Sequence, residues 1–437
     1  MVFVAYQAEA CLVNMAKKIF ALGVVILAVF SWVRLIDARQ EVGVFLALMA
    51  IASVAYLLVI WLVHARAPGS TTALVGCLFL GLIFRVVLVS SSPIMSDDVY
   101  RYIWDGRVQQ YGLNPYGSVP NDPELESLHT ELTRRIHPTS AALPSIYPPL
   151  AQRLFYGITS IHESVGALAI TMVVADALIV VLLWRWLVVA GRNRWWVLAY
   201  AWHPLVVLEG AGGAHIDSFG TLLLVASGLA LSLRRSLLAS VTFAGAIAIK
   251  FVPVVLVPLL WRRIRLAHAI LAAMVLVLLY LPFMRDGVLP VGSLGTYLSQ
   301  WRFNAPFFRG LEPLLGVPSV VVASVCVGLL VAGFARRYMR RDDPRAWAWP
   351  VAAAVVLMPA IYPWYLIWLT PFLTVAGTFP LVIWTVTSIS TYAVWVSELG
   401  GEGWNLPMSV ELFEYGCVAA SAVGIYWFNR SSGQVVC

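Results

Sequence analysis

Long apolar runs separated by short polar stretches make up most of the sequence. A membrane-spanning helix needs about 20 mostly apolar residues. Runs of that kind lie at residues 19–36, 42–63, 71–91, 165–190, 195–211, 216–233, 266–284, 317–335, 345–361, 364–377, 379–397 and 408–428. One further apolar stretch, 236–261, consists of two short pieces interrupted at Lys250. The pattern predicts an all-α, polytopic membrane bundle of about 12–14 membrane segments, which forms a single domain over residues 1–437.

Two polar segments break this pattern. The first covers residues 92–147, 56 residues in all, and the second covers about 285–316. The positive-inside rule places loops rich in Lys and Arg on the cytoplasmic side. If 236–261 is a helical hairpin with Lys250 at its tip, the arginine clusters at 262–265 and 336–341 both lie inside. Both polar segments then lie outside, and we expect the first, larger loop to carry short amphipathic helices.

The composition agrees with a membrane location. Hydrophobic residues make up 61% of the chain and charged residues 12%, whereas a soluble protein is nearer about 50% and 25%. This excludes a soluble enzyme, a disordered protein and a secreted disulfide scaffold. The net charge of +7 comes almost entirely from arginine, which in a membrane protein is typical of loops that face anionic lipid rather than of nucleic-acid binding. The five cysteines show neither metal-ligand nor disulfide spacing.

Two adjacent carboxylates, Asp97 and Asp98, stand near the start of the first polar segment. At the end of a span, desolvation raises the pKa of at least one carboxyl, and a raised pKa suits a general base. On a helix, however, Asp97 and Asp105 would each lie four residues from Arg101, so a salt-bridged surface helix explains the charge pattern equally well. The proline-rich, aromatic stretch around Tyr147 favours a catalytic loop, because irregular backbone at the membrane surface usually lines a cavity.

Three more polar residues fall on the same side. His215 and Asp217 follow a glycine-rich turn, where polar residues are also common as simple interface anchors. Lys250 is the only lysine after residue 18 and has apolar neighbours. A charge at the bilayer centre costs roughly 2.5–3.5 kcal/mol on insertion scales, so Lys250 is a candidate functional residue. It would bind a phosphate as a point charge, or alternatively extend from a helix end to the membrane surface.

The second polar segment and a later helix break supply the remaining candidates. Trp301, Arg302 and Asn304 form a combination suited to phosphate or sugar binding, although an aromatic belt with an arginine for lipid headgroups explains it equally well. Tyr362 and Trp364 lie in a proline-containing break between two later apolar runs. We expect these side chains to face outward.

In the order of its motifs, the sequence resembles the GT-C superfamily of membrane glycosyltransferases. The motifs are SDDVYRYIWDG, GLNPY, IYPPL, HPLVVLEGAGGAHID, AIKFVPVVLVP, WRFN and PAIYPWYLIWLTPFL, and they cover about residues 90–400. More narrowly, the chain is similar to the bacterial and archaeal polyprenyl-phosphate-mannose-dependent mannosyltransferases. No single motif is very specific, and the resemblance depends on their order and outward placement together.

This resemblance implies inverting transfer of a sugar, expected to be mannose, from a polyprenyl-phosphate donor to a glycolipid or glycan at the outer face of the plasma (cytoplasmic) membrane. It places the catalytic base on Asp97, while Asp98 would orient the base, bind a sugar hydroxyl or ligate a divalent metal. Lys250 and Arg302 would bind the departing phosphate. The remaining substrate-binding candidates are Arg101, Tyr147, His215, Asp217, Trp301, Asn304, Tyr362 and Trp364. The sequence has no dedicated metal cage, so metal dependence stays open. Since no large soluble domain follows residue 428, the acceptor is expected to be small.

Two other functions remain open at this stage. A transporter or flippase of lipid-linked sugars would explain the apolar runs and the charges within them, but it predicts two related halves, and the sequence shows none. A non-catalytic assembly subunit predicts that the polar residues have no common meeting point. The enzyme interpretation predicts instead that Asp97, Lys250, Arg302 and Tyr362 line one outward cavity.

Overall fold

The computed structural model describes residues 2–66, 68–89, 92–284 and 290–431. Within these ranges the chain is helical and contains no β-strand, apart from one isolated backbone bridge between Phe303 and Ala360. The predicted all-α class is therefore confirmed. The second predicted outer segment, 285–316, starts with residues 285–289, which lie outside the described ranges.

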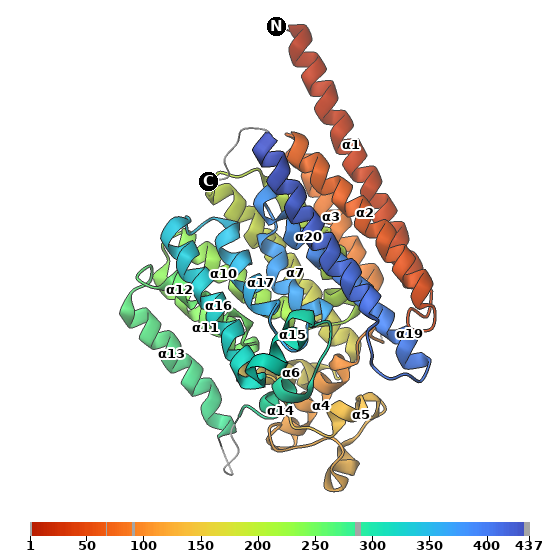
Figure 1. Ribbon diagram of the computed structural model, residues 1–437, viewed down its shortest axis with the longest axis vertical. Helices are drawn as coiled ribbons and strands as arrows, with labels where there is room; N and C mark the ends of the chain where they lie inside the picture. Colours follow the sequence, from red (N-terminus) through yellow and green to blue (C-terminus); the bar gives the residue numbers. More distant parts are fainter. Residues whose placement is uncertain (1, 67, 90–91, 285–289, 432–437) are drawn as a thin grey trace.

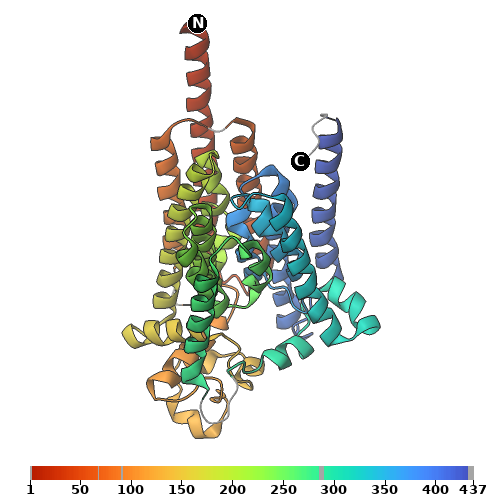
Figure 2. The same ribbon diagram turned by 90° about the vertical axis from the view of Figure 1, so that its left-hand side faces the viewer.

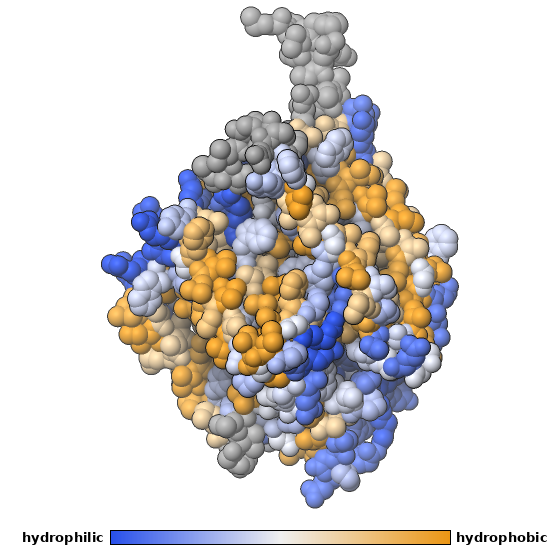
Figure 3. Space-filling view, viewed as in Figure 1, coloured by the Kyte–Doolittle hydropathy of each residue, from blue (hydrophilic) through white to orange (hydrophobic). Residues whose placement is uncertain are grey.

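Eight segments of the described chain are long and apolar enough to cross a membrane. They are Asn14–Val33, Val42–Ala65, Thr71–Leu88, Val165–Val189, Leu266–Phe283, Val317–Tyr338, Ala376–Leu399 and Met408–Trp427. Large apolar side chains on their flanks are exposed, for example Trp61 and Val181, of which 62% and 63% are accessible. Figure 3 shows such side chains spread over the sides of the molecule. Because apolar surface of this extent needs a lipid environment, the chain is a multi-pass membrane protein.

The long helices form a bundle around shorter ones (Figure 1). Their bounds are α1 (Val2–Val33), α2 (Val42–Arg66), α3 (Thr71–Leu88), α7 (Val165–Val189), α13 (Leu266–Tyr280), α16 (Val317–Tyr338) and α20 (Met408–Ser431). The shorter apolar helices are α8 (Leu198–Ala201), α9 (Pro204–Val207), α10 (Asp217–Ser232), α11 (Ser236–Ile249), α12 (Val257–Leu260), α17 (Pro344–Val355), α18 (Phe379–Thr387) and α19 (Val394–Leu399).

The apolar run predicted at 195–211 shows why these segments are shorter than the sequence pattern indicates. It divides into α8, α9 and a π-helical turn at Leu208–Gly212, and Pro204 begins the second piece because proline has no N–H for a continuing helix. All of its side chains from Val197 onward are buried by other helices. A run can thus be apolar because protein surrounds it rather than lipid, and hydropathy alone does not separate the two cases.

The remaining helices gather at the lower end of the bundle in Figures 1 and 2. They are α4 (Asp98–Gln110), α5 (Pro138–Ala141), α6 (Pro149–Ile161), α14 (Leu294–Gln300) and α15 (Pro306–Leu315). The first three belong to the first predicted polar segment and its return to the bundle, and the last two to the second. Both segments therefore lie at one end, whereas α1 begins and α20 ends at the opposite end (Figure 1).

A buried charged group connects three helices inside the bundle. Asp176 of α7 accepts hydrogen bonds from Arg85 Nε of α3 at 3.0 Å and from the Tyr200 hydroxyl of α8 at 2.6 Å. In the sequence Asp176 is an isolated acid in an apolar helix. Both charged side chains are almost fully enclosed, and a buried charge is stable only when it is paired and hydrogen-bonded. These contacts fix the helices that support the lower end.

Candidate functional site

A cavity of about 320 Å³ opens at the lower end of the bundle, where the two polar segments meet the breaks in the apolar helices. Its wall comes from the start of α4, the 137–147 loop, α14 with the residues beside it, the 362–365 segment and the end of α19. The lining residues that the sequence identified as site candidates are Asp97, Asp98, Arg101, Tyr147, Trp301, Tyr362 and Trp364. Residues from distant parts of the chain thus meet at one place. Of the four residues that the enzyme interpretation places in one cavity, Asp97 and Tyr362 line it.

The two adjacent carboxylates have different surroundings. Asp97 precedes the first turn of α4 and forms an ion pair with Arg39 Nη2 at 2.8 Å. Arg39, from the α1–α2 turn, also donates to the carbonyl of Ile94 and lies over the ring of Trp395. Arg39 therefore holds Asp97 against the cavity wall, and the predicted pairing of Asp97 with Arg101 is not formed.

Among the residues that the structure describes, no arginine forms an ion pair with Asp98, and 34% of its side-chain surface is accessible at the cavity. Its enclosure by the surrounding protein raises the pKa of its carboxyl to about 6, because desolvation disfavours the charged form. The ammonium of Lys250 lowers this pKa, and the carboxylates of Asp217 and Asp97 raise it. A carboxyl that titrates near neutrality and faces a cavity is suited to accept a proton.

Lys250 lies just behind this wall. Helix α11 ends at Ile249 and Lys250 adopts an extended backbone conformation, which is the helix break that the sequence predicts. Its ammonium binds both oxygens of Asp217, at 2.8 and 3.0 Å, and lies 4.1 Å from the centre of the Tyr365 ring. Asp217 also accepts a hydrogen bond from the indole of Trp368. Lys250 and Asp217 therefore form a pair close to Asp98, but neither lines the cavity, so the expectation that Lys250 does is wrong.

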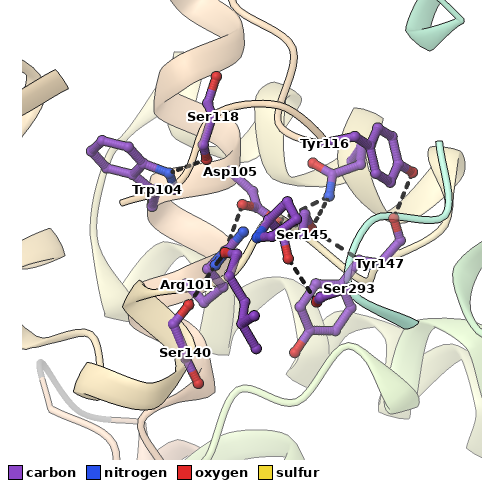
Figure 4. A network of polar contacts seen from close by, with 12 residues as sticks. Arg101, Trp104, Asp105, Tyr116, Ser118, Ser140, Ser145, Tyr147 and Ser293 are labelled. Atoms are coloured by element: carbon purple, nitrogen blue, oxygen red, sulfur yellow. Dashed lines mark hydrogen bonds and ion pairs between the residues drawn. The ribbon is translucent and has the colours of Figure 1, made fainter. Parts of the chain in front are cut away.

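Arg101 is fixed within the first loop and keeps one free group. Its Nε binds Asp105 at 2.8 Å, and its Nη1 donates to the carbonyls of Ser140 and Leu143 (Figure 4). The pairing of Arg101 with Asp105, four residues along the helix, is the one that the charge pattern suggests. Its Nη2 is buried and has no hydrogen-bond partner, although Arg101 lines the cavity. An unpaired buried guanidinium N–H is costly, so this group is suited to bind an anion or a hydroxyl.

A polar network behind Arg101 holds the first loop in place (Figure 4). The buried carboxylate of Asp105 also accepts hydrogen bonds from the Ser145 hydroxyl and from the Gln152 amide. The Tyr116 hydroxyl donates to the Tyr147 carbonyl at 2.6 Å, and Ser293 from the second polar segment donates to the carbonyl of Pro144. The network joins α4, the 137–147 loop and α6, and it positions Tyr147 at the cavity.

Stacked rings form the opposite wall. Phe303 stacks on Tyr362 with ring centres 4.5 Å apart, Tyr362 on Trp364 at 4.6 Å, and Trp364 on His215 at 4.2 Å. A short parallel bridge between Phe303 and Ala360 sets the register of the two segments. His215 is completely buried beneath Trp364, and its Nδ1 lies 3.9 Å from Asp98. The predicted candidates Tyr362 and Trp364 thus form one continuous surface that ends at the acidic group.

Five sequence candidates do not line the cavity: Lys250, Asp217 and His215 lie behind its wall, and Arg302 and Asn304 bind other partners. Arg302 forms a two-pronged ion pair with Glu312 of α15, at 2.7 and 3.0 Å, and lies over the ring of Phe308. The buried Asn304 adopts a left-handed backbone conformation, with φ of 48°, and donates to Glu414 of α20. Neither residue is among those that line the cavity, so the expectation that Arg302 lines it together with Asp97 is wrong. The carboxylate of Glu312, ten residues further along the chain, binds the guanidinium of Arg302.

Several residues at or beside the cavity were not among the sequence candidates. Arg39, which binds Asp97 but does not itself line the cavity, lies in a short turn and had no recognisable motif. Tyr297 and Tyr365 line the cavity and share a hydrogen bond between their hydroxyls at 2.5 Å. Tyr365 stands directly after Trp364 in a break rich in aromatic residues, which was the one available signal. Among the described residues, no group of three or more His, Cys, Asp or Glu side chains is arranged to hold a metal ion.

Comparison with known proteins identifies a family for this chain. Residues 10–264, more than half of the 437-residue chain, match the family described as alpha-(1->6)-mannopyranosyltransferase, N-terminal domain. The matched region includes α4, the first polar loop, the His215–Asp217 turn and Lys250. No curated protein matches the chain. The chain therefore belongs to the alpha-(1->6)-mannopyranosyltransferase family, a family of GT-C type glycosyltransferases.

Proposed function

We propose that this protein transfers mannose from a polyprenyl-phosphate donor, with inversion, to a hydroxyl group of a glycolipid or glycan at the outer face of the cytoplasmic membrane. Membership of a mannosyltransferase family supports the sugar and the reaction type. The proposed donor and mechanism depend mainly on the position of Asp98. Its accessible carboxylate, with a pKa raised to about 6, lies between a lysine and an aromatic wall.

The catalytic base in this proposal is Asp98 rather than Asp97. The resemblance to known enzymes placed the base on the first carboxylate of the pair. Both carboxylates line the cavity, but Asp97 is already bound by Arg39, whereas Asp98 has no such ion pair and its pKa is raised. In the reaction the carboxylate of Asp98 takes the proton of the acceptor hydroxyl, whose oxygen forms a bond to the anomeric carbon as the bond to the phosphate oxygen breaks. A single displacement of this kind inverts the anomeric centre. Asp97, bound by Arg39, is proposed to orient the start of α4.

The departing phosphate needs positive charge but no general acid, because a phosphate ester leaves as a stable anion. Lys250 and the free Nη2 of Arg101 are the two cationic groups beside Asp98 that support this role. Lys250 would bind the phosphate as a point charge, while it stays paired with Asp217. Arg302 has no part in this proposal, since Glu312 occupies it.

The sugar rings are proposed to lie along the stacked surface of Tyr362 and Trp364. Pockets for small molecules are usually lined by aromatic side chains with a few polar groups that fix orientation, and this cavity has that composition. Tyr147 on the opposite wall would contact the sugar next to Asp98. His215 and Asp217 are proposed to support the site from behind the cavity and not to contact substrate, because both are completely buried.

The proposed outward orientation follows from charge. α7 and α16 both finish at the end of the bundle opposite the cavity, and arginine-rich stretches follow them at 192–194 and 336–341. Under the positive-inside rule these stretches are cytoplasmic, so the cavity faces outward. In this proposal residues 92–147 are the catalytic outer loop of a single membrane domain, and residues 285–316 are the second outer loop.

Mannosyl transfer in proteoliposomes tests the proposal. Purified protein would receive polyprenyl-phosphate-mannose and a membrane glycolipid extract as acceptor. We expect Asp98→Asn to lower kcat by about 10²–10⁴-fold, the usual contribution of a general base. Glu398→Gln is the matched control, because Glu398 is another carboxylate that lines the cavity. Full activity of Asp98→Asn would refute the proposal. Movement of the lipid-linked sugar across the bilayer without any transfer would support a flippase instead.

Divalent metal dependence is tested in the same assay. In the mechanism above, Lys250 and Arg101 supply the positive charge, so transfer is expected to persist when the protein is dialysed against a chelator. Loss of activity that Mg²⁺ or Mn²⁺ restores would assign a metal to the phosphate and would change the role of Asp98 from base to ligand.

A further inference from the structure

Two tyrosine hydroxyls meet at the cavity, and the proposed mechanism does not use them. Tyr297 belongs to α14 in the second polar segment, and Tyr365 directly follows Trp364 of the stacked wall. The two hydroxyl oxygens lie 2.5 Å apart and share one hydrogen bond, and both residues line the cavity. Both also lie beyond residues 10–264, so the family match assigns them no role.

The hydroxyl pair has hydrogen-bonding capacity that its internal bond does not use. A tyrosine hydroxyl donates one hydrogen bond and also accepts. The shared bond consumes the hydrogen of one hydroxyl, so the other hydroxyl keeps its hydrogen and lone pairs remain on the oxygens. Within the part of the chain that the structure describes, neither hydroxyl forms a second hydrogen bond. The pair can therefore donate to a ligand and accept from it.

This capacity fits a sugar hydroxyl better than a phosphate. Burial raises the pKa of the Tyr297 hydroxyl, so the group is a neutral phenol at neutral pH and not a phenolate. A sugar hydroxyl, like a tyrosine hydroxyl, both donates and accepts. The phosphate dianion has no hydrogen to donate, so it would leave the lone pairs of the tyrosines unused.

Neighbouring rings hold both tyrosines in place before any substrate binds. The ring of Tyr365 packs edge-on against Tyr362, with ring centres 5.7 Å apart, and the ammonium of Lys250 lies 4.1 Å from its centre. Tyr297 packs against Trp301, with ring centres 5.8 Å apart. A hydroxyl pair that is already ordered loses little conformational entropy when it binds a ligand.

The hydroxyl pair is also close to the proposed reacting group. Besides burial, the carboxylates of Asp98 and Asp217 raise the pKa of Tyr297, so Asp98 and Tyr297 interact electrostatically, and both line the cavity. In the proposed reaction Asp98 directs the acceptor oxygen to the anomeric carbon, C1. The hydroxyl on C2 is the sugar hydroxyl next to C1, and it is therefore the one expected to reach the tyrosines.

We propose that Tyr297 and Tyr365 bind the C2 hydroxyl of the donor sugar and thereby determine the sugar specificity, in a role that rests on the proposed function of the cavity. Mannose carries this hydroxyl axially, whereas glucose, its C2 epimer, carries it equatorially. An epimer that directs the hydroxyl elsewhere leaves the tyrosine hydroxyls unsatisfied in a largely buried place, which is costly. A site that hydrogen-bonds a substrate hydroxyl discriminates far more strongly than apolar contact does.

The first experiment compares two donors with the wild-type protein in the mannosyl-transfer assay. The donors are polyprenyl-phosphate-mannose and its 2-deoxy analogue, and kcat/KM is measured for each. We expect a preference for the mannose donor of at least about tenfold, because the 2-deoxy donor leaves the tyrosine hydroxyls without a partner. Equal kcat/KM values for the two donors would refute the inference without any variant.

The second experiment removes the hydroxyls and keeps the rings. In the double variant Tyr297→Phe, Tyr365→Phe, we expect the preference for mannose over the 2-deoxy donor to disappear to within about twofold, because neither donor can form the hydrogen bond. Tyr415→Phe is the matched control. The Tyr415 hydroxyl donates to the carbonyl of Asn304 at 3.0 Å, also in the second polar segment, and Tyr415 does not line the cavity. The control should keep the wild-type preference.

These measurements separate a specificity role from a structural one. Tyrosines that only support the fold, or that bind the acceptor sugar, would lower the rate with both donors equally, so a wild-type preference in the double variant would overturn the inference. If the double variant does not fold, Tyr297→Phe and Tyr365→Phe are measured singly. At least one should reduce the preference about threefold or more, and a wild-type preference in both would be equally decisive against it.

The same data distinguish this inference from the proposed function. If the wild-type protein transfers no mannose from polyprenyl-phosphate-mannose, the proposed function is wrong. If it transfers mannose and the double variant keeps the wild-type preference, only the role of the tyrosine hydroxyls is wrong.

Discussion

The raised pKa of Asp98 makes the rate of mannosyl transfer depend on pH in a defined direction. Only the ionised carboxylate accepts a proton, so kcat/KM follows its ionised fraction. With a pKa of about 6, about 90% of Asp98 is ionised at pH 7 and about 10% at pH 5, so kcat/KM should fall about tenfold between these values. A carboxyl with an ordinary pKa near 4 would lose only a small part of its activity over the same range.

Lys250 provides the second half of this prediction. Its ammonium lowers the pKa of Asp98, and the paired Asp217 raises it. In Lys250→Met the favourable charge is lost and the carboxylate of Asp217 remains, so the pKa of Asp98 rises further. The fall of kcat/KM on the acidic side of its pH profile, the acidic limb, therefore moves to higher pH. The total rate is also expected to fall because the phosphate loses a cation, but the position of the limb is independent of that loss.

The assay measures kcat/KM for polyprenyl-phosphate-mannose from pH 4.5 to 8 in detergent, with thermal unfolding recorded at each pH so that loss of structure is separated from loss of ionisation. Arg302→Met serves as the control because it removes a cation that lies outside the cavity. A flat profile between pH 5 and 7 would refute the assignment of Asp98. An acidic limb at the same pH in the wild type and in Lys250→Met would show that the titrating group is not beside Lys250.

Three further predictions come from single contacts. Arg302→Met should keep the KM for the donor within about twofold of the wild-type value, because Glu312 holds Arg302 outside the cavity. A tenfold increase in KM would indicate that Arg302 binds the donor phosphate after all. Arg39→Ala releases Asp97 and should lower kcat about tenfold. Arg39→Gln should lower kcat to the same extent, because an amide lacks the charge that pairs with Asp97. Wild-type activity of Arg39→Ala would show that the ion pair is dispensable. Asp176→Ala leaves Arg85 buried without its carboxylate and should lower the free energy of unfolding, measured with denaturant in mild detergent, by about 3–5 kcal/mol. The double variant Arg85→Met, Asp176→Leu should recover most of that loss. Equal instability of the single and the double variant would contradict the reasoning.

Several of the candidate residues that the sequence singled out share one property. Asp98, His215 and Lys250 each lie at a break or an end of an apolar run, and all such ends on one side of a membrane lie at the same depth. Few charges are available in a chain that is 12% charged, so those at the helix ends on one side of the bundle are brought near one another by topology alone. These candidates were therefore recognisable before any contact was known, although His215 and Lys250 lie behind the cavity wall.

The assignment of roles within the acidic pair required tertiary contacts. Asp97 and Asp98 are neighbours of the same type, and the sequence offers no means to rank them. The α1–α2 turn brings Arg39 to Asp97, and the α10–α11 hairpin brings Lys250 and Asp217 to Asp98. Both contacts join segments separated by more than 50 residues along the chain, so no local pattern encodes them.

The sequence by itself determined the membrane environment, the helical class and the positions of the two polar segments, because hydrophobic burial in lipid depends on composition and on the length of each run. The tertiary structure decided which apolar runs are enclosed by protein rather than by lipid, which carboxylate of the acidic pair is bound by Arg39, and that Arg302 binds Glu312 instead of lining the cavity. These outcomes depend on distances between side chains that are remote in sequence, and electrostatic interactions and desolvation change steeply over such distances.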